Sequence, residues 1–343
     1  MKRLQNTLYV TTQGSYLLRE GETVKVRVKG DTKLRVPIHT LGNIICFGRV
    51  SCSPFLMKLC AERHVGLAFL SEHGRMFARI QGPTGGNVLL RRAHYRLAET
   101  EERSSDIARR IVAAKIANSR NVLLRCVRER PEDPHSGVIA AAADEMKQRL
   151  RALQHPMSLA SVRGIEGDAA KNYFGVFDHL ITGDKKAFFF RQRNRRPPLD
   201  NVNALLSFLY TVLAHDVSSA LEAFGLDAAV GFLHRDRPGR PGLALDLMEE
   251  LRPHVVDRLV LALVNRRQIK GSGFQTTESG AVQMNDETRK EVIVAYQNRK
   301  QESLRHPFLD ETVTIGLLPY LQAQLLARHI RGELDAYPPF FWK

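Results

Sequence analysis

Apolar and polar residues alternate with the period of a β-strand in the N-terminal quarter of the chain. The stretch VKVRVKG, from Val24 to Gly30, carries apolar side chains at every second position and basic ones between them, as expected for a strand with one exposed face. Further runs of strand length are TLYVTT, KLRVPI and NIICFG. One helix is predicted among them, because Ser53 can cap it and Pro54 suits its first turn. The pattern therefore predicts a β-rich N-terminal part.

The period of the hydrophobic pattern changes after QGPTGG, a cluster of turn-forming residues at Gln81 to Gly86. Beyond this cluster, apolar side chains recur three and four positions apart in residues 87–127, and helical spacing continues from Ser158 to Arg331. We therefore predict an α+β protein, with a small N-terminal β-rich domain at 1–84 and a larger all-α domain at 85–343.

Composition and charge narrow the classes of function. The 343 residues are 43% hydrophobic, which suffices for a substantial core. Lys and Arg number 51 against 36 Asp and Glu, a net charge of +15. Such an excess favours a polyanionic partner, most simply nucleic acid, although basic proteins without one exist. No run has the signal-peptide pattern or the ~20 apolar residues of a membrane span, so we expect a soluble, cytoplasmic protein without a membrane partner.

The cysteines point to no metal or disulfide framework. There are four of them, and none forms a C-x-x-C pair. We expect buried, reduced thiols.

Glu166 is the first residue with candidate chemistry. It lies between Gly164 and Gly167, just before an alanine-rich helical run. Flanking glycines let other groups approach the backbone closely. A carboxylate is also favourable at a helix N-terminus in its own right, so an ordinary N-terminal acid is the alternative interpretation.

His234 is the second candidate. Arg235, Arg237 and Arg240 follow it in a loop rich in proline and glycine. So many basic side chains in so short a loop are typical of a surface that faces phosphate groups. An ordinary surface histidine is the alternative.

Acidic residues on a predicted helix follow this loop. Asp246 and Glu249 are three positions apart, and so are Glu249 and Arg252, which places them on one helix face. A solvated acidic face with one arginine pair is the alternative interpretation.

Taken together, these segments indicate a metal site. Two carboxylates and one neutral imidazole are a workable donor set for a divalent ion, and imidazole favours Mn over Mg. Carboxylates on a surface that binds a polyanion are costly unless a cation lies between them and the phosphate. We expect the acids and the histidine to hold the metal and the arginines to hold the strand. A metal so placed can polarise a phosphodiester and stabilise the leaving oxygen.

A dense basic run from Arg191 to Arg196 precedes a helix that Asp200 can cap. On this helix Asn203, Ser207 and Tyr210 share one face, which is either a buried polar seam or part of the site. A basic run is also compatible with a solvated surface. The residues predicted to contact nucleic acid are Arg193, Arg195, Arg196 and Arg235.

Three motifs, in their order along the chain, resemble a known family: RGIEGDAAKNYF, RRPPLDNVNALLSFLY and GFLHRDRPGRPGLALDLMEELRP. They resemble the CRISPR-associated integrases that capture new spacers, the family of the first-numbered Cas protein. The resemblance covers essentially the whole chain. In sequence detail, including the ending YPPFFWK, the chain is most similar to members from type I-C systems.

The resemblance implies an activity and partners. It implies a β-domain for dimerisation, a helical catalytic domain, a homodimer and a small second Cas protein as partner. The DNA substrates implied are double-stranded, a prespacer and the CRISPR repeat. The implied chemistry is transesterification by a DNA 3′-hydroxyl, together with endonuclease activity that depends on Mn or Mg. A non-catalytic DNA-binding scaffold in the same complex is the alternative, and the intact acid–histidine–acid set argues against it.

The resemblance also implies site residues. Carried over by motif, the catalytic metal ligands are Glu166 in GIEG, His234 in FLHRD and Glu249 in LALDLMEELRP. Many members have Asp at the third position, so Glu249 brings a longer side chain. Asp246 and Arg252 would support the site. The aromatic C-terminal tail either packs on its own domain or docks on a partner.

Overall fold

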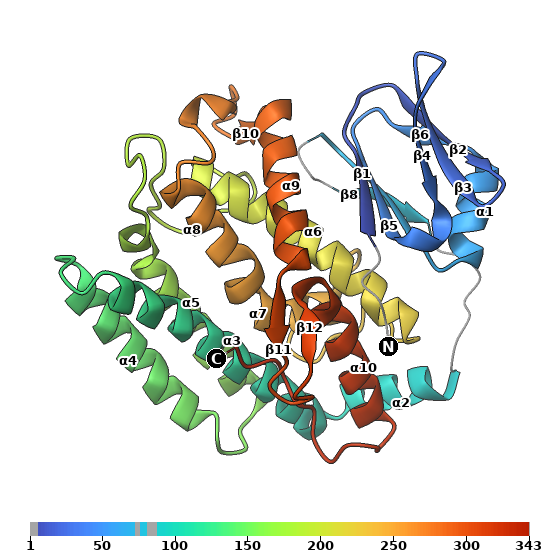
Figure 1. Ribbon diagram of the computed structural model, residues 1–343. Coiled ribbons are helices and arrows are strands. Elements are labelled where there is room, and N and C mark those ends of the chain that lie inside the picture. Colours follow the sequence, from blue (N-terminus) through green and yellow to red (C-terminus); the bar gives the residue numbers. More distant parts are fainter. Residues whose placement is uncertain (1–5, 73–75, 81–87, 343) are drawn as a thin grey trace. The chain divides into compact units, whose positions relative to one another are not determined.

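The computed structural model describes residues 6–72, 76–80 and 88–342 (Figure 1). They form a mixed α+β protein with a β-rich N-terminal part followed by a mainly helical part, which confirms the predicted fold class.

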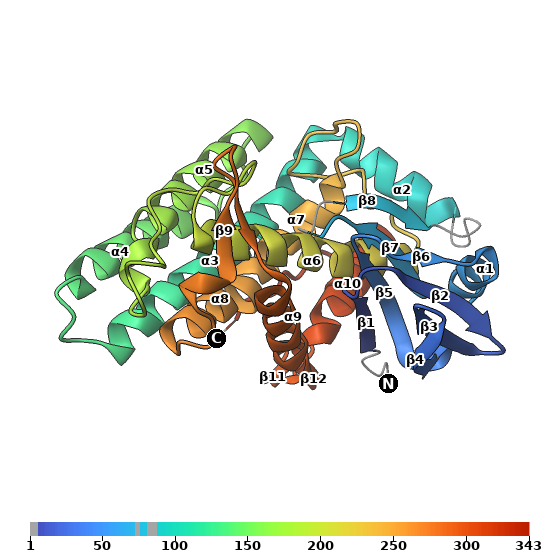
Figure 2. The same cartoon turned by 90° about the horizontal axis from the view of Figure 1, so that it is seen from above.

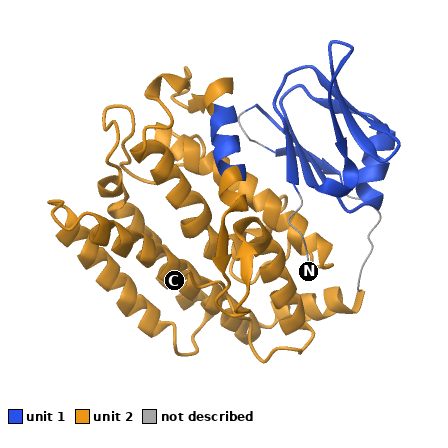
Figure 3. Ribbon diagram, in the orientation of Figure 1, with its two compact units in different colours: residues 1–86, 289–297 blue, residues 87–288, 298–343 orange. Residues whose placement is uncertain are grey.

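The chain divides into two compact units (Figure 3). One unit contains residues 1–86 and 289–297, and the other contains residues 87–288 and 298–343. The domain boundary predicted at 84/85 falls within residues 81–87, outside the described part of the chain.

The β-rich unit contains two four-stranded sheets with one hydrophobic core. The first sheet has the order β1 (Asn6–Val10), β5 (Leu41–Phe47), β7 (Gly66–Leu70) and β8 (Met76–Ile80). The second has the order β4 (Asp31–Pro37), β3 (Thr23–Val28), β2 (Ser15–Glu20) and β6 (Ser51–Cys52). Helix α1 (Pro54–Glu62) is capped as predicted, since the Ser53 hydroxyl accepts a hydrogen bond of 3.2 Å from the Leu56 N–H.

The rest of the described chain is mainly helical. Its helices are α2 (Val88–Glu99), α3 (Glu101–Glu129), α4 (Ser136–Ala152), α5 (Leu159–Gly175), α6 (Asn201–Ala223), α7 (Gly242–Arg252), α8 (Arg258–Asn265), α9 (Asp286–Gln301) and α10 (Leu318–Ile330). Helices α3, α4 and α5 pack side by side, as Figures 1 and 2 both show, and α6 packs against α7 and α10.

Helix α6 is the apolar centre of the helical unit. Its first turn is capped as predicted, because the Asp200 carboxylate accepts a hydrogen bond of 2.7 Å from the Asn203 N–H. By length and composition alone α6 could cross a membrane, but 78% of its most apolar window is buried within the protein. Burial against neighbouring helices accounts for its apolar character.

The larger unit also contains two short β-hairpins, which an all-α domain would lack. Strand β9 (Phe274–Thr276) pairs with β10 (Val282–Met284), and β11 (Ser303–Arg305) pairs with β12 (Thr312–Thr314). Strands of three residues are too short to produce an alternating pattern that can be recognised in the sequence.

A buried histidine lies between two arginines in this unit. His254 belongs to a π-helical turn, η3 (Pro253–Asp257), that joins α7 to α8. Its Nδ1 lies 3.2 Å from Arg258 Nη1 and its Nε2 lies 3.1 Å from Arg299 Nη2. Burial, together with the positive charges of Arg299 and Arg258, lowers the pKa of His254 to about 2. The imidazole is therefore neutral in the folded protein at neutral pH.

The depressed pKa predicts that His254 makes stability depend on pH. An unfolded histidine has a pKa near 6.5, so below that pH unfolding takes up a proton that the folded site rejects. The stabilisation is present above pH 6.5 and is lost as the pH falls towards the folded value. Between pH 7.5 and 5.5 the wild type should lose about 1 kcal/mol more unfolding free energy than His254→Gln. Urea unfolding at both pH values measures the difference, and equal losses would contradict it.

Candidate active site

Glu166 lies in the middle of helix α5 and not at its start, which corrects the sequence interpretation. The helix begins at Leu159, after Ser158, whose hydroxyl accepts a hydrogen bond of 3.2 Å from the Ser161 N–H. The two glycines beside Glu166 suggested a helix start, yet both lie inside α5. The Ser158 cap, which comes earlier in the sequence, determines where the helix begins.

Gly164 and Gly167 leave the surface of α5 bare on both sides of Glu166. Both are exposed, and a Cβ atom at either position would meet no other atom within 4 Å. Each interior glycine costs a helix about 1 kcal/mol relative to alanine. Packing within the chain gives no reason for these two glycines.

Asp246 anchors the loop that carries His234. Its carboxylate is completely buried. It accepts hydrogen bonds from the backbone N–H groups of Phe232 at 2.6 Å, Leu233 at 2.9 Å and His234 at 3.0 Å. Gly231 is required beside this anchor, since a Cβ there would lie 2.8 Å from the Gly242 carbonyl carbon. One side chain of α7 therefore fixes the loop that precedes the helix.

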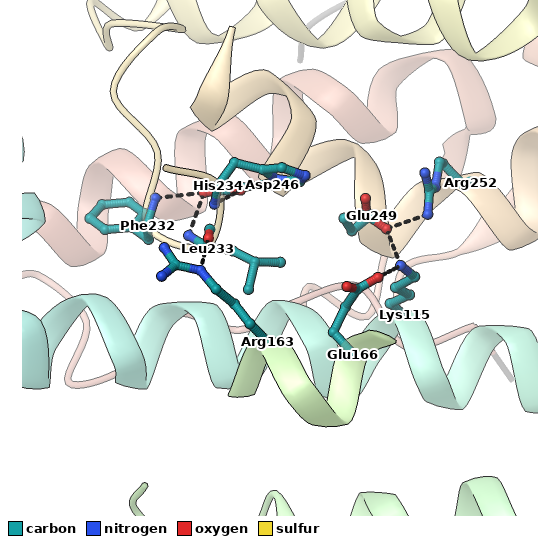
Figure 4. Close-up of polar contacts among 9 residues, drawn as sticks. All are labelled: Lys115, Arg163, Glu166, Phe232, Leu233, His234, Asp246, Glu249 and Arg252. Carbon is teal, nitrogen blue, oxygen red and sulfur yellow. Dashed lines mark hydrogen bonds and ion pairs between the residues drawn. The ribbon is translucent and has the colours of Figure 1, made fainter. Parts of the chain in front are cut away.

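Asp246 also orients the His234 ring. The ring Nδ1 lies 2.6 Å from Asp246 Oδ1 (Figure 4). An ionised carboxylate can only accept, so Nδ1 donates the hydrogen, and in the neutral form of the ring the lone pair is at Nε2. A carboxylate behind a histidine in this way is typical of histidines that ligate metals.

Lys115 of α3 joins two of the predicted ligands. Its side chain is buried, and its ammonium group pairs with Glu166 and with Glu249 Oε2, the latter at 2.7 Å (Figure 4). Arg252 Nη2 also lies 2.5 Å from Glu249 Oε2. Carboxylates from α5 and α7 therefore converge on one cation.

The charges around Glu249 keep it ionised. Burial raises the pKa of Glu249, but the positive charges of Arg252 and Lys115 outweigh this effect and lower the pKa to about 2. Helix α5 also contacts the loop that carries His234, because the Arg163 side chain donates a hydrogen bond of 2.6 Å to the Leu233 carbonyl (Figure 4).

The structure brings Glu166 and Glu249 together, whereas His234 pairs with Asp246. In the ranges that the structure describes, no three His, Cys, Asp or Glu side chains are arranged as a metal site. The assignment of the three ligands therefore stays a prediction. Still, two carboxylates that already share one cation and a histidine that presents its Nε2 lone pair are chemically suited to Mn or Mg.

Lys115 was missed in the sequence analysis, although a signal was available. It follows Ile111 by four positions on the apolar face of α3, where a lysine is buried only if it is paired. Its partners come from α5 and α7, and no local pattern reveals them.

A buried polar layer lies behind Arg252. The Arg252 guanidinium lies over the Tyr210 ring, 4.8 Å from the ring centroid. The Tyr210 hydroxyl donates a hydrogen bond of 2.5 Å to Asp257, and the Tyr173 hydroxyl donates one of 3.1 Å. A cavity with room for about one water molecule lies between these residues and Lys115.

Arg193 belongs to this layer. It donates hydrogen bonds to Asn203 Oδ1 at 2.6 Å and to Ser207 Oγ at 3.1 Å, and it lies 5.4 Å from the Tyr210 ring centroid. The shared face of Asn203, Ser207 and Tyr210 is thus a buried polar seam that holds Arg193.

The other predicted DNA-contacting arginines are exposed: Arg195, Arg196 and Arg235. Burial lowers the pKa of Arg240, and repulsion from Arg237 and Arg195 lowers it further. The two basic loops, residues 191–196 and 235–240, are therefore close enough for their charges to repel each other.

The chain is similar to known proteins over its whole length. Residues 8–298 match the family described as CRISPR associated protein Cas1. The CRISPR-associated endonuclease Cas1 1 of Chlorobaculum tepidum is 53% identical over 343 residues, which cover all of both chains. A structure of a casposase bound to integration product is similar over 99% of this chain and 95% of its own, with a TM-score of 0.85 and 20% identity.

A second solved structure, a Cas6-RT-Cas1–Cas2 complex, is similar over all of this chain and 36% of its own, with a TM-score of 0.83 and 21% identity. At these identities the two structures show the shared fold. None of these names specifies a CRISPR subtype, so the type I-C assignment stays a prediction. The family match and the full-length relative show that the chain belongs to the CRISPR-associated Cas1 family.

Proposed function

We propose that this chain is a metal-dependent DNA integrase and endonuclease that inserts new spacers into a CRISPR array. The observation that carries the proposal is the convergence of Glu166 and Glu249 on one cation next to the loop of His234 (Figure 4). The full-length relative is named an endonuclease, and the similar casposase is bound to integration product, so both support the same chemistry.

Glu166, Glu249 and His234 Nε2 would hold Mn or Mg. When bound, the ion supplies a Lewis acid that polarises the phosphodiester under attack. Asp246 keeps the hydrogen of His234 on Nδ1, so that Nε2 remains a donor of electrons. Arg195, Arg196 and Arg235 would bind the phosphates of the strand, and the bare surface at Gly164 and Gly167 would let its backbone approach Glu166.

The proposed reaction is transesterification at the boundary of the repeat. The oxygen of a DNA 3′-hydroxyl forms a bond to phosphorus and gives up its proton. The phosphorus–oxygen bond to the departing strand breaks, and the departing oxygen takes up a proton. The number of phosphodiester bonds is conserved, so no nucleotide cofactor is required.

Lys115 takes part in this proposal as a competitor for the metal. Its ammonium group occupies the carboxylate oxygens that a divalent ion would use. Without a metal it keeps two neighbouring carboxylates from repelling each other inside the protein. Metal binding requires the ammonium group to move away from them.

The proposed assembly is a homodimer formed through the β-rich unit, acting with a small second Cas protein on double-stranded DNA in the cytoplasm. The similar solved complex, in which Cas1 is paired with Cas2, supports that partner.

Replacing each proposed ligand should abolish strand transfer. We expect Glu166→Ala, His234→Ala and Glu249→Gln each to lower integration of a fluorescent DNA duplex into a repeat-bearing plasmid at least 100-fold. The alanine variants remove a donor atom, and Glu249→Gln removes the negative charge that a divalent ion prefers. Asp168→Ala, an exposed acid on α5, is the control and should stay within about twofold. Full activity in all three variants would show that these residues are not the catalytic metal ligands.

Removing the Lys115 ammonium should tighten metal binding. We expect Lys115→Met to bind Mn at least tenfold more tightly than the wild type in isothermal titration calorimetry, about 1.4 kcal/mol. Without metal the variant should be less stable, since its carboxylates lose a partner. Lys171→Met, an exposed lysine on α5, is the control. Equal affinity in the wild type and Lys115→Met would contradict the competition, and no binding by either would contradict metal dependence.

Replacing Gly164 or Gly167 by alanine should raise the stability of the protein and lower its activity. Gly164→Ala and Gly167→Ala should each raise the unfolding free energy by up to about 1 kcal/mol, because alanine favours the helix and meets no atom in the protein. Both should lower the affinity for DNA and the rate of strand transfer if the strand backbone approaches there. Thermal unfolding and a binding assay test this, and undiminished DNA binding would show that no strand approaches α5 at this point.

A further inference from the structure

The C-terminal tail, residues 336–342, is held inside the helical unit. Tyr337 and Phe340 have no exposed surface, and the Trp342 ring lies against Arg258, 4.4 Å from its guanidinium carbon. Of the two alternatives left open by the sequence, the structure shows the tail packed on its own domain.

Side chains hold this tail, and neither a helix nor a sheet does. Pro338 and Pro339 lack backbone N–H groups, so this stretch can join neither kind of regular structure in full. Backbone groups of Pro338, Phe340 and Trp342 pair with side chains of other elements. The position of the tail therefore depends on a few specific side chains.

Glu250 of α7 makes the first attachment. Its completely buried carboxylate accepts hydrogen bonds from the Tyr337 hydroxyl, from the Phe340 N–H at 2.5 Å and from the Gln322 side-chain amide at 3.2 Å. Two of these three donors belong to the tail. Since a buried carboxylate without partners costs several kcal/mol, the position of α7 at Glu250 depends on the tail.

Asn118 of α3 makes the second attachment. Its amide group donates to the backbone oxygen of Glu250 at 2.7 Å and to that of Phe340 at 2.8 Å. Its side-chain oxygen accepts from the Trp342 N–H at 2.7 Å. One fully buried side chain therefore joins α3, α7 and the tail.

Both attachments adjoin the candidate active site. Glu250 directly follows Glu249, and Asn118 lies about one turn beyond Lys115 on α3. We propose that the tail is a strap that positions Lys115 and Glu249 by joining α3 to α7, with Asn118 and Glu250 as the positioning residues. The inference rests on the proposed function, because that function gives Lys115 and Glu249 their roles at the metal.

A truncated chain and a peptide test the strap. The chain truncated after Asp335 is compared with the full chain, alone and with a synthetic peptide of residues 336–343. We expect truncation to weaken Mn binding and strand transfer at least tenfold and to lower hydrogen-exchange protection around Lys115 and Glu249. The peptide should restore all three in a saturable way, and a peptide with Tyr337→Phe should restore them less.

Two full-length variants separate positioning from general stability. Asn118→Ala should weaken Mn binding as truncation does, and it remains informative if the truncated chain does not fold. Ile139→Ala, which truncates a buried residue of α4, should lower the melting temperature without changing the Mn affinity.

Three outcomes would overturn the strap. One is unchanged Mn affinity and unchanged exchange protection in both the truncated chain and Asn118→Ala. Another is an equal loss of Mn affinity in Ile139→Ala. The third is truncation that abolishes binding of the small second Cas protein while Mn binding and exchange protection persist, which would make the tail a docking peptide. If the full chain binds no Mn, the proposed function fails instead. Hydrogen-exchange protection alone then decides whether the tail positions Lys115 and Glu249.

Discussion

The helical unit depends on the pairing of opposite charges that are buried in its interior. Glu249 is buried and ionised because two cations, Lys115 and Arg252, lie against it. Lys115 can be buried only because two carboxylates share its ammonium group. Removing any member would leave an uncompensated charge in the interior, which is among the most destabilising changes a protein can suffer. The packing of α3, α5 and α7 therefore depends on the same charged side chains that form the candidate active site.

The same constraint separates the arginines into two kinds. Arg252 and Arg193 both lie over the Tyr210 ring and have buried hydrogen-bond partners, so they belong to the framework of the site. Arg195 and Arg235 are exposed and repel other arginines of the two basic loops and nearby α5. A polyanion that binds these loops would relieve that repulsion, whereas the framework arginines need no ligand to be stable.

Several features of the site lower the stability of the protein, and the fold itself does not require them. Two exposed glycines interrupt α5 on either side of Glu166 and have no packing role in the chain. A lysine takes a position on α3 that an apolar residue could fill. The C-terminal tail is fixed by side chains because its prolines prevent regular pairing. Such departures from local preference are expected where binding or catalysis sets the requirement.

The sequence by itself determined the β-rich start, the helical remainder and the caps at Ser53 and Asp200, because these depend on local periodicity and on side chains next to the backbone they cap. The motifs around Glu166, His234 and Glu249 identified the family. Only the tertiary structure decided that Lys115 joins two of these residues, that Arg193 is part of the framework, and that the tail links α3 to α7. These contacts join residues that are from ten to more than two hundred positions apart. Local patterns carry no information about such partners, which are set by how the helices pack.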